Sequence, residues 1–280
     1  MTEEKKQTAL VTVASYLNND KIKSYLESIL KDRVGQFITS LVSMSNLTPG
    51  LSKCEPNSLM QCGLKAASLN LPLDNNLGFA YAIPYGNKAS FQMGWKGFVQ
   101  LAQRTGQYKT VNVITVKEGE LKKWDPFNGE LEIEIIEDVK REKLPAIGYA
   151  AVFRLINGFE KRSYWTKTEV LAHAKRFSKT FGNGPWQTDF DKMAMKTVLK
   201  DLISKYGPMS VELQEAIKFD QAVIKEDADG NQYPEYPDNP DSKEPTQDSP
   251  YNENTVEANY EVSGDDENRT LLDGMEGDKK

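Results

Sequence analysis

The chain has 280 residues, with 35 Lys and Arg against 41 Asp and Glu, so its formal net charge is −6. This length suits one large domain or two small ones, and a hydrophobic content of 39% is enough for a core. No stretch approaches the roughly 20 apolar residues that span a bilayer. The N-terminus, MTEEKKQTAL, lacks the apolar region of a secretory signal. The sequence therefore predicts a cytoplasmic protein without a membrane partner.

The charge is divided unevenly along the chain. Residues 1–225 hold 31 basic and 24 acidic residues, a net of +7, whereas residues 226–280 hold 4 and 17, a net of −13. The second segment is rich in proline and poor in apolar residues, a composition typical of disorder. We therefore predict a mildly basic folded body over 1–225 and a disordered acidic tail over 226–280.

Few residues suggest metal or redox chemistry. Cys54 and Cys62 have too few companions for a zinc site and are expected to be reduced thiols packed near a helix. His173 is the only histidine of the chain, which argues against a zinc or catalytic role. We predict no metal and no cofactor.

Apolar periodicity predicts helices first. An apolar stripe at three-to-four spacing predicts one long helix over residues 20–46, and Pro49 and Gly50 follow it as breakers. Pro56 suits the first turn of a second helix that runs to Leu69. The stripe of the first helix covers more of its circumference than one packing face needs, so this helix is a candidate contact between subunits.

Alternation then predicts strands, with further helices between and after them. Strands are expected over residues 77–85 and 88–93, joined by a Gly86-Asn87 turn, and over 108–116, 131–136, 146–155 and 160–165. Helices are expected from Gly94 to about Thr105, from Thr166 or Thr168 to about Phe177, and over residues 188–206 and 210–225.

The helix after Gly94 carries cations on one side and apolar residues on the other. Lys96, Gln100 and Arg104 share the polar side, which contains no carboxylate. Ordinary solvated helices mix charges of both signs. Flanking strands add Lys88, Lys109 and Lys117. An ordinary surface helix is the alternative, but the unmixed charge favours a nucleic-acid backbone as ligand.

The helix over residues 188–206 repeats this design. Lys192, Lys196 and Lys200 follow one another at four-residue steps along the border of its apolar side, where like charges repel by a few tenths of a kcal/mol per pair. That repulsion predicts an anion beside them, such as a phosphate. Ahead of this helix, glycines precede Trp186, which either stacks on a base or packs in the core. Core packing is favoured.

An acidic run offers a different interpretation. Glu130, Glu132 and Glu134 would share one face of a strand, with Glu137 and Asp138 after them, and could hold a divalent metal. A solvated edge that repels wrong strand partners is favoured. The metal reading is nevertheless the basis of a rival function, a metal-dependent nuclease.

Several segments together resemble the RecT family of phage and prophage single-strand annealing proteins. They appear in the family's order and cover roughly residues 30–220: LNLPL at 69–73, YAIPYGNK at 81–88, QMGWKG at 92–97, LAQRTG at 101–106, GPW at 184–186 and MAMKT at 193–197. The resemblance implies an α+β fold, distantly shared with other annealing proteins, in which a small antiparallel sheet and packed helices form a basic groove. Lys96, Arg104, Lys196 and Lys200 match the family's basic positions. One departure is that Ala194-Met195 stands where the family has a lysine, whose charge Lys192 would replace.

The resemblance also implies a function without enzymatic turnover. We predict ATP-independent binding of single-stranded DNA and annealing of complementary strands in phage-type recombination, by a homo-oligomer that forms a ring or helical filament. A 5′→3′ exonuclease and a host single-strand-binding protein are the expected partners. The predicted DNA-binding residues are Lys88, Gln92, Lys96, Gln100, Arg104, Lys109, Lys117, Trp186, Lys192, Lys196 and Lys200. The rivals are the nuclease and a non-catalytic scaffold with an acidic tail.

Overall fold

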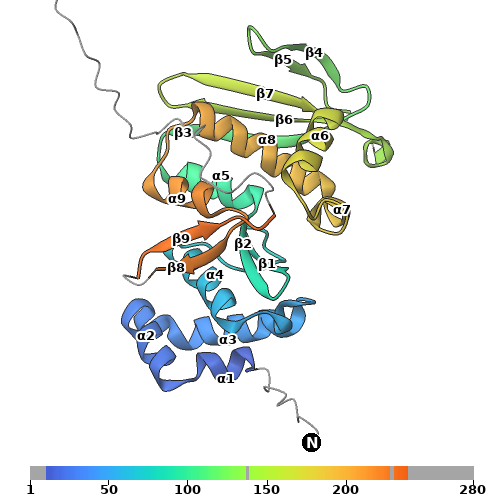
Figure 1. The fold of residues 1–280 in the computed structure, drawn as a ribbon. Coiled ribbons are helices and arrows are strands. Elements are labelled where there is room, and N and C mark those ends of the chain that lie inside the picture. The colour runs from blue at the N-terminus through green and yellow to red at the C-terminus, as the bar shows by residue number, and fades with distance from the viewer. Residues whose placement is uncertain (1–10, 137–138, 228–229, 239–280) are drawn as a thin grey trace, which may run out of the picture. The chain divides into compact units, whose positions relative to one another are not determined.

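The structure, a computed structural model, describes residues 11–136, 139–227 and 230–238. Helices and small antiparallel sheets are mixed along this chain, so the fold is α+β as predicted (Figure 1). The helices are α1 (Val13–Leu17), α2 (Asp20–Leu30), α3 (Val34–Leu47), α4 (Pro56–Ser68), α5 (Trp95–Arg104), α6 (Lys167–Phe177), α7 (Pro185–Thr188), α8 (Phe190–Tyr206) and α9 (Val211–Phe219). Short 3₁₀ turns are η1 (Lys31–Arg33), η2 (Leu51–Lys53) and η3 (Val139–Lys143).

The strands form one three-stranded sheet and three hairpins, all antiparallel. They are β1 (Ala80–Tyr85), β2 (Lys88–Met93), β3 (Tyr108–Lys117), β4 (Leu121–Asp125), β5 (Glu130–Ile133), β6 (Ala146–Leu155), β7 (Glu160–Thr166), β8 (Val223–Glu226) and β9 (Gln232–Glu235). The larger sheet has the order β3-β6-β7, and the hairpins are β1-β2, β4-β5 and β8-β9. Helix α8 packs on the three-stranded sheet and on α5.

Local sequence signals fix many element ends. Gly86 adopts a left-handed φ of 57° in the β1-β2 turn, which the Gly86-Asn87 pair predicted. Thr166 begins α6 with a capping box, in which its hydroxyl accepts from the Glu169 backbone and the Glu169 carboxylate accepts from the Thr166 backbone. Pro56 opens α4 as expected.

The predicted long helix over 20–46 is interrupted. It is divided into α2 and α3 by η1, where Lys31 has a left-handed φ of 51°. The buried stripe nevertheless continues across the break through Leu26, Leu30, Val34 and Ile38. Burial of this stripe is compatible with a bent axis, and no glycine or proline between residues 20 and 34 signals the bend.

The folded body extends past the predicted boundary at residue 225. The predicted helix over 210–225 ends at Phe219, and Gln221 takes a left-handed φ of 69° before β8 begins. Strand β9 follows, and the chain then runs to Asp238, whose side chain accepts hydrogen bonds from the Thr180 backbone at 2.8 Å and the Ser178 hydroxyl at 2.6 Å. Of the tail predicted to be disordered over 226–280, residues 228–229 and 239–280 lie outside the described residues.

Two further sequence expectations concern thiols and membranes. Cys54 and Cys62 are unpaired and buried, as predicted. None of the helices in the described ranges combines the length and the apolar character that a bilayer crossing needs.

Candidate nucleic-acid interface

Three lysines lie in a row along α8, but only part of the row faces outward. The side chain of Lys192 is 62% exposed, and its ammonium donates to the Asp189 carboxylate at 2.7 Å, which raises the pKa of Lys192. The side chain of Lys200 is 28% exposed, whereas that of Lys196 is 5% exposed. The row therefore offers Lys192 and Lys200 to a ligand and buries the lysine between them.

Lys196 and Lys200 share one buried carboxylate. Lys196 Nζ lies 2.7 Å from Asp220 Oδ1 and Lys200 Nζ lies 2.9 Å from Asp220 Oδ2. The Met93 backbone N–H donates to the same carboxylate at 2.9 Å. Burial raises the pKa of Asp220, but the two ammoniums outweigh it and hold this pKa below its ordinary value. Burial lowers the pKa of Lys196 to about 8.

The shared carboxylate corrects one expectation from the sequence. Repulsion along the lysine row was expected to require an external anion, but Asp189 and Asp220 of the chain itself supply the negative charge. Asp220 lies 20 or more positions after these lysines and was not considered as their partner. Lys196, predicted to contact DNA, is engaged within the fold in this structure.

Lys96 lies near Gly78 and Tyr81, and Lys192 also acts on Tyr81. Lys96, in the first turn of α5, donates to the Leu77 carbonyl at 3.3 Å. A Cβ placed on Gly78 would lie 3.0 Å from the Tyr81 hydroxyl and 3.7 Å from Lys96 Cδ. Burial raises the pKa of Tyr81, and the nearby Lys192 ammonium opposes that rise. The two predicted cationic helices thus contribute to one surface.

Of four other predicted residues, three make contacts within the fold. The Arg104 guanidinium donates to the Leu69 and Asn70 carbonyls at 2.8 Å each, which satisfies the C-terminal end of α4. Gln92 is buried with Nε2 3.1 Å from Met193 Sδ, and Gln100 carries a buried Oε1 without a partner among the described residues. Trp186 is 5% exposed and packs at 5.5 Å on Phe190, in line with the core packing that was favoured.

The three predicted lysines on strands lie apart from the α8 row. Lys88 Nζ is 3.9 Å from the Glu235 carboxylate on β9, and the adjacent Lys225 lowers the pKa of Lys88. Lys109 is exposed and Lys117 half-buried on β3, an edge strand of the larger sheet. None of the described contacts joins them to Lys192 or Lys200. Their contact with DNA stays a prediction.

Comparison with known proteins decides the family. A sequence model of the RecT family matches residues 35–241, from α3 to just past Asp238. The chain belongs to the RecT family. It is 48% identical over 217 residues to "Uncharacterized protein YqaK" of Bacillus subtilis (strain 168), covering 77% of this chain and 72% of that protein. It is 28% identical over 222 residues to "Protein RecT" of Escherichia coli (strain K12), covering 75% and 80%. Membership supports single-strand annealing in DNA recombination.

A groove along β7, which the sequence reading missed, adds further cations to this RecT-family chain. Lys161, Arg162 and Lys205 line a cavity of about 520 Å³, together with Trp124, Trp165 and Tyr206. Lys161 Nζ stands 4.8 Å from the centroid of the Tyr206 ring, a cation–π contact. The adjacent Lys161-Arg162 pair within an alternating strand was the available signal. A neighbouring cavity of about 230 Å³ shares Trp165 and Asp201 with this groove.

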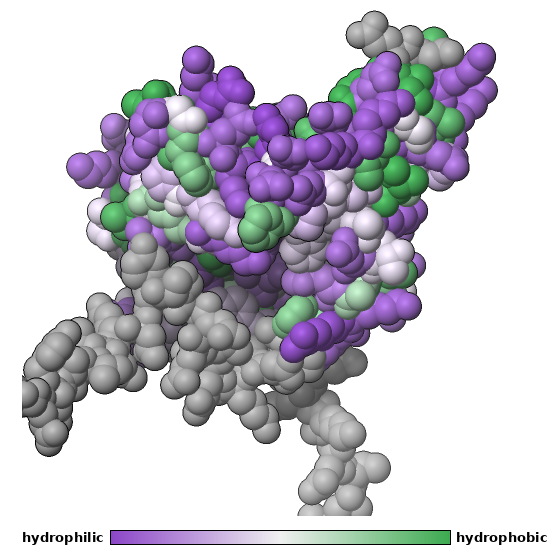
Figure 2. Space-filling model, turned by 90° about the horizontal axis from the view of Figure 1, so that it is seen from above, coloured by the Kyte–Doolittle hydropathy of each residue, from purple (hydrophilic) through white to green (hydrophobic). Residues whose placement is uncertain are grey.

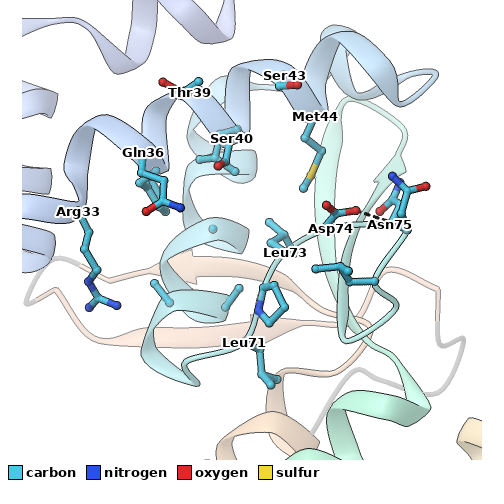
Figure 3. Close-up of a pocket in the computed structure, with 18 of the residues that line it drawn as sticks. Arg33, Gln36, Thr39, Ser40, Ser43, Met44, Leu71, Leu73, Asp74 and Asn75 are labelled. Carbon is cyan, nitrogen blue, oxygen red and sulfur yellow. Dashed lines mark hydrogen bonds between the residues drawn. The ribbon is translucent and has the colours of Figure 1, made fainter.

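A larger cavity of about 990 Å³ lies between α3 and the segment that joins α4 to β1. Figure 3 shows Gln36, Ser40 and Met44 on the side of α3 that faces Leu73 and Asp74 of that segment. Arg33 is its only labelled basic side chain in the view, so the cavity has little of the cationic character of the β7 groove.

Two carboxylates of the acidic run form ion pairs. Glu130 lies 2.5 Å from Lys123 and Glu134 lies 3.2 Å from Lys122, while Glu137 and Asp138 fall outside the described residues. Across residues 11–136, 139–227 and 230–238, no three His, Cys, Asp or Glu side chains gather closely enough to hold a metal. These pairs agree with the solvated strand that was favoured over a metal site.

The surface is mostly hydrophilic on the face in Figure 2. Hydrophobic side chains gather there in separate patches, the largest at the upper right. Exposed apolar residues in the described ranges include Ile29 at 48%, Leu47 at 79% and Phe127 at 93%.

Proposed function

We propose that this RecT-family protein binds single-stranded DNA by its sugar–phosphate backbone and anneals complementary strands without ATP. The observation that carries the proposal is that exposed lysines of two helices, Lys96 and Lys192, both lie near Tyr81, with Lys200 further along α8. About 12 Å of helix separates Lys192 from Lys200 at 1.5 Å per residue, so these two lysines can reach two phosphates of one strand. Backbone contacts leave base edges free to pair.

The proposed surface combines weak contacts, which favours assembly. A single protomer that neutralises a few phosphates binds with roughly 10⁻⁴ to 10⁻⁶ M affinity at physiological salt. Stable pairing over a long strand follows when neighbouring protomers share one DNA. We therefore include a homo-oligomer, a ring or helical filament, in the proposal. The exposed apolar side chains Tyr25 and Ile29 on α2 are its candidate contacts.

The wider setting follows from the family. We propose that a 5′→3′ exonuclease generates the single strands and that a host single-strand-binding protein covers them beforehand. The cytoplasmic location stays a prediction of the same kind.

The direct test mixes the protein with two complementary labelled oligonucleotides, added in succession without ATP and with EDTA present. Energy transfer between the labels should rise faster than in the protein-free control. Unaccelerated pairing would contradict the proposal, and degradation that requires magnesium would favour the nuclease instead.

The cationic surface is tested by Lys96→Ala and Lys192→Ala, with the exposed Lys23→Ala on α2 as the matched control. Each loss of a phosphate contact should make the negative slope of log affinity against log salt less steep, by about 0.7 on single strands. The control should keep the slope of the unaltered protein. An unchanged slope in both test variants would remove this surface from the DNA path.

A further inference from the structure

The cavity of about 230 Å³ beside Trp165 combines aromatic walls with a charged floor. Trp165, His173 and Phe177 form one wall, with the rings of His173 and Phe177 4.6 Å apart and those of Trp165 and His173 5.5 Å apart. Lys196, Lys200 and Asp220 lie among the residues that line it. The cavity therefore offers an aromatic face and ionic groups side by side.

The charges that line this cavity are balanced, and one lysine among them is accessible. Asp220 is shared by Lys196 and Lys200, and Asp201 is paired with Lys205 at 2.8 Å. Two lysines and two aspartates therefore line the cavity, because Lys205 lies outside its lining, and burial lowers the pKa of His173. Lys200 is the member of the Asp220 cluster that is partly exposed. An anion that enters the cavity would meet its ammonium.

Size and shape narrow the ligand further. The volume lies below the roughly 300 Å³ at which pockets for drug-sized molecules begin. A single planar ring with one anionic group is of the right size. Every nucleobase offers a π-face that stacks on aromatic side chains without regard to sequence, and its phosphate supplies the anion.

We propose that this cavity binds one nucleotide, with its base against the Trp165–His173–Phe177 wall and its phosphate at Lys200. The inference rests on the proposed DNA binding and adds a subsite to it. A base held here is withdrawn from its neighbours, so each protomer would hold one nucleotide of its strand out of the stack. Free nucleotides offer the same base and phosphate, and the experiment distinguishes them from a nucleotide within a DNA strand.

Phe177→Ala is the informative variant, because Phe177 ends α6 and its residue is already 36% exposed. Phe159→Ala is the matched control, since Phe159 is 46% exposed and packs on Phe153 outside the cavity. Loss of a stacking partner should weaken binding of a thymidine oligonucleotide roughly 5- to 100-fold. The salt slope should not change, because no phosphate contact is removed, and Phe177→Tyr should restore affinity.

A strand of abasic sugar–phosphate units distinguishes this subsite from the backbone surface. Phe177→Ala should bind the abasic strand as well as the unaltered protein does. Equal affinities of both proteins for the thymidine strand would overturn the nucleotide subsite and leave the proposed function standing. Failure of the unaltered protein to bind any strand would instead overturn the proposed function.

Two more measurements identify the source of the nucleotide. An oligonucleotide that contains 5-iododeoxyuridine should cross-link to Trp165 or Phe177, as expected for a strand-borne base. If free thymidine monophosphate binds to the unaltered protein but not to Phe177→Ala, a separate nucleotide also fits the cavity. Cross-links that form only outside the cavity would overturn the proposal. If an acidic peptide, and not DNA, shielded the Phe177 side chain from solvent, the cavity would instead bind a protein partner.

Discussion

A single carboxylate, that of Asp220, holds three parts of the molecule together. It accepts from the Met93 backbone at the end of β2 and from Lys196 and Lys200 on α8, while it follows α9 itself. A buried charge keeps its place only when its partners are present, and removal of one partner from such a pair costs about 3–5 kcal/mol. The residue therefore matters more for the fold than its position after the last long helix suggests.

Asp220→Ala should lower the free energy of unfolding by about 3–5 kcal/mol, because Lys196 stays buried without its carboxylate. Replacement of both groups, Asp220→Ala with Lys196→Met, should recover much of that loss. Urea denaturation followed by circular dichroism measures both. If Asp220→Ala alone were as stable as the unaltered protein, Asp220 would contribute nothing to the stability of the fold.

The buried position of Lys196 also lets us predict how the free energy of unfolding changes at alkaline pH. The pKa of Lys196 is about 8 in the folded protein, whereas the ordinary value of 10.5 applies to the unfolded chain. Between pH 8 and pH 10.5 the unfolded chain therefore binds more protons than the folded protein does. The contribution of Lys196 to stability should therefore rise with pH across that window. Urea midpoints from pH 7 to 10, compared between the unaltered protein and Lys196→Met, isolate this contribution. A difference that stays constant with pH would contradict it.

Among the elements, the segment Tyr236–Asp238 fixes the loop between α6 and α7. The Asp238 carbonyl accepts from the Lys179 backbone at 2.9 Å, and its carboxylate accepts from Ser178 and Thr180. The Tyr85 hydroxyl donates to the Pro237 carbonyl at 2.9 Å, which ties the same segment to the end of β1. The chain after β9 thus supports the loop that leads to Trp186.

A protein that ends at residue 238 should unfold like the full chain, whereas one that ends at 225 should be less stable by at least about 2 kcal/mol. The shorter form loses β9 and several hydrogen bonds, each worth about 0.5–1.5 kcal/mol. Trypsin should also cleave after Lys179 faster in the shorter form, because the loop loses its support. Identical unfolding midpoints and cleavage rates would show that the segment is dispensable.

Elements with local signals could be predicted, and those held by distant contacts could not. The turn at Gly86, the cap at Thr166 and the helix after Pro56 each carry their own signal. Strand β9 has the sequence QYPE, and Gln232 is held there by Gln61 from α4. No local pattern predicts such a contact.

The same distinction applies to the candidate site. Four-residue spacing identified the lysine row on α8 and the polar side of α5. Burial of Lys196 depends on Asp220, and the role of Arg104 depends on carbonyls at the end of α4, both of which are tertiary contacts. A sequence shows which side chains share a helix side, but not which of them the fold already uses.

At the scale of the whole molecule, the proposed annealing depends on how copies of the protein meet. Tyr25 and Ile29 are exposed on α2 at 38% and 48%, whereas Leu26 and Leu30 of the same helix are buried. Apolar side chains on an outer helix side that lie beside a buried stripe are suited to contact with another protomer. We therefore expect Tyr25 and Ile29 to be the residues of this helix that contact another protomer.

Ile29→Glu should shorten the oligomers and slow annealing together, with the circular dichroism spectrum unchanged. Ser24→Glu, which places the same charge at an exposed polar position of α2, is the control and should assemble normally. Light scattering with and without DNA measures assembly. Efficient annealing of long strands by an Ile29→Glu monomer would show that assembly is not required.

The anchored position of Asp238 has a consequence for how the rest of the chain acts. Residues 239–280 contain 12 Asp and Glu against 4 Lys and Arg, and they begin at a point fixed to the folded body. Charges attached in this way act at a local concentration set by the length of chain, not by the amount of protein in solution. Dilution would therefore leave any competition between these carboxylates and DNA phosphates unchanged, whereas added salt would weaken it.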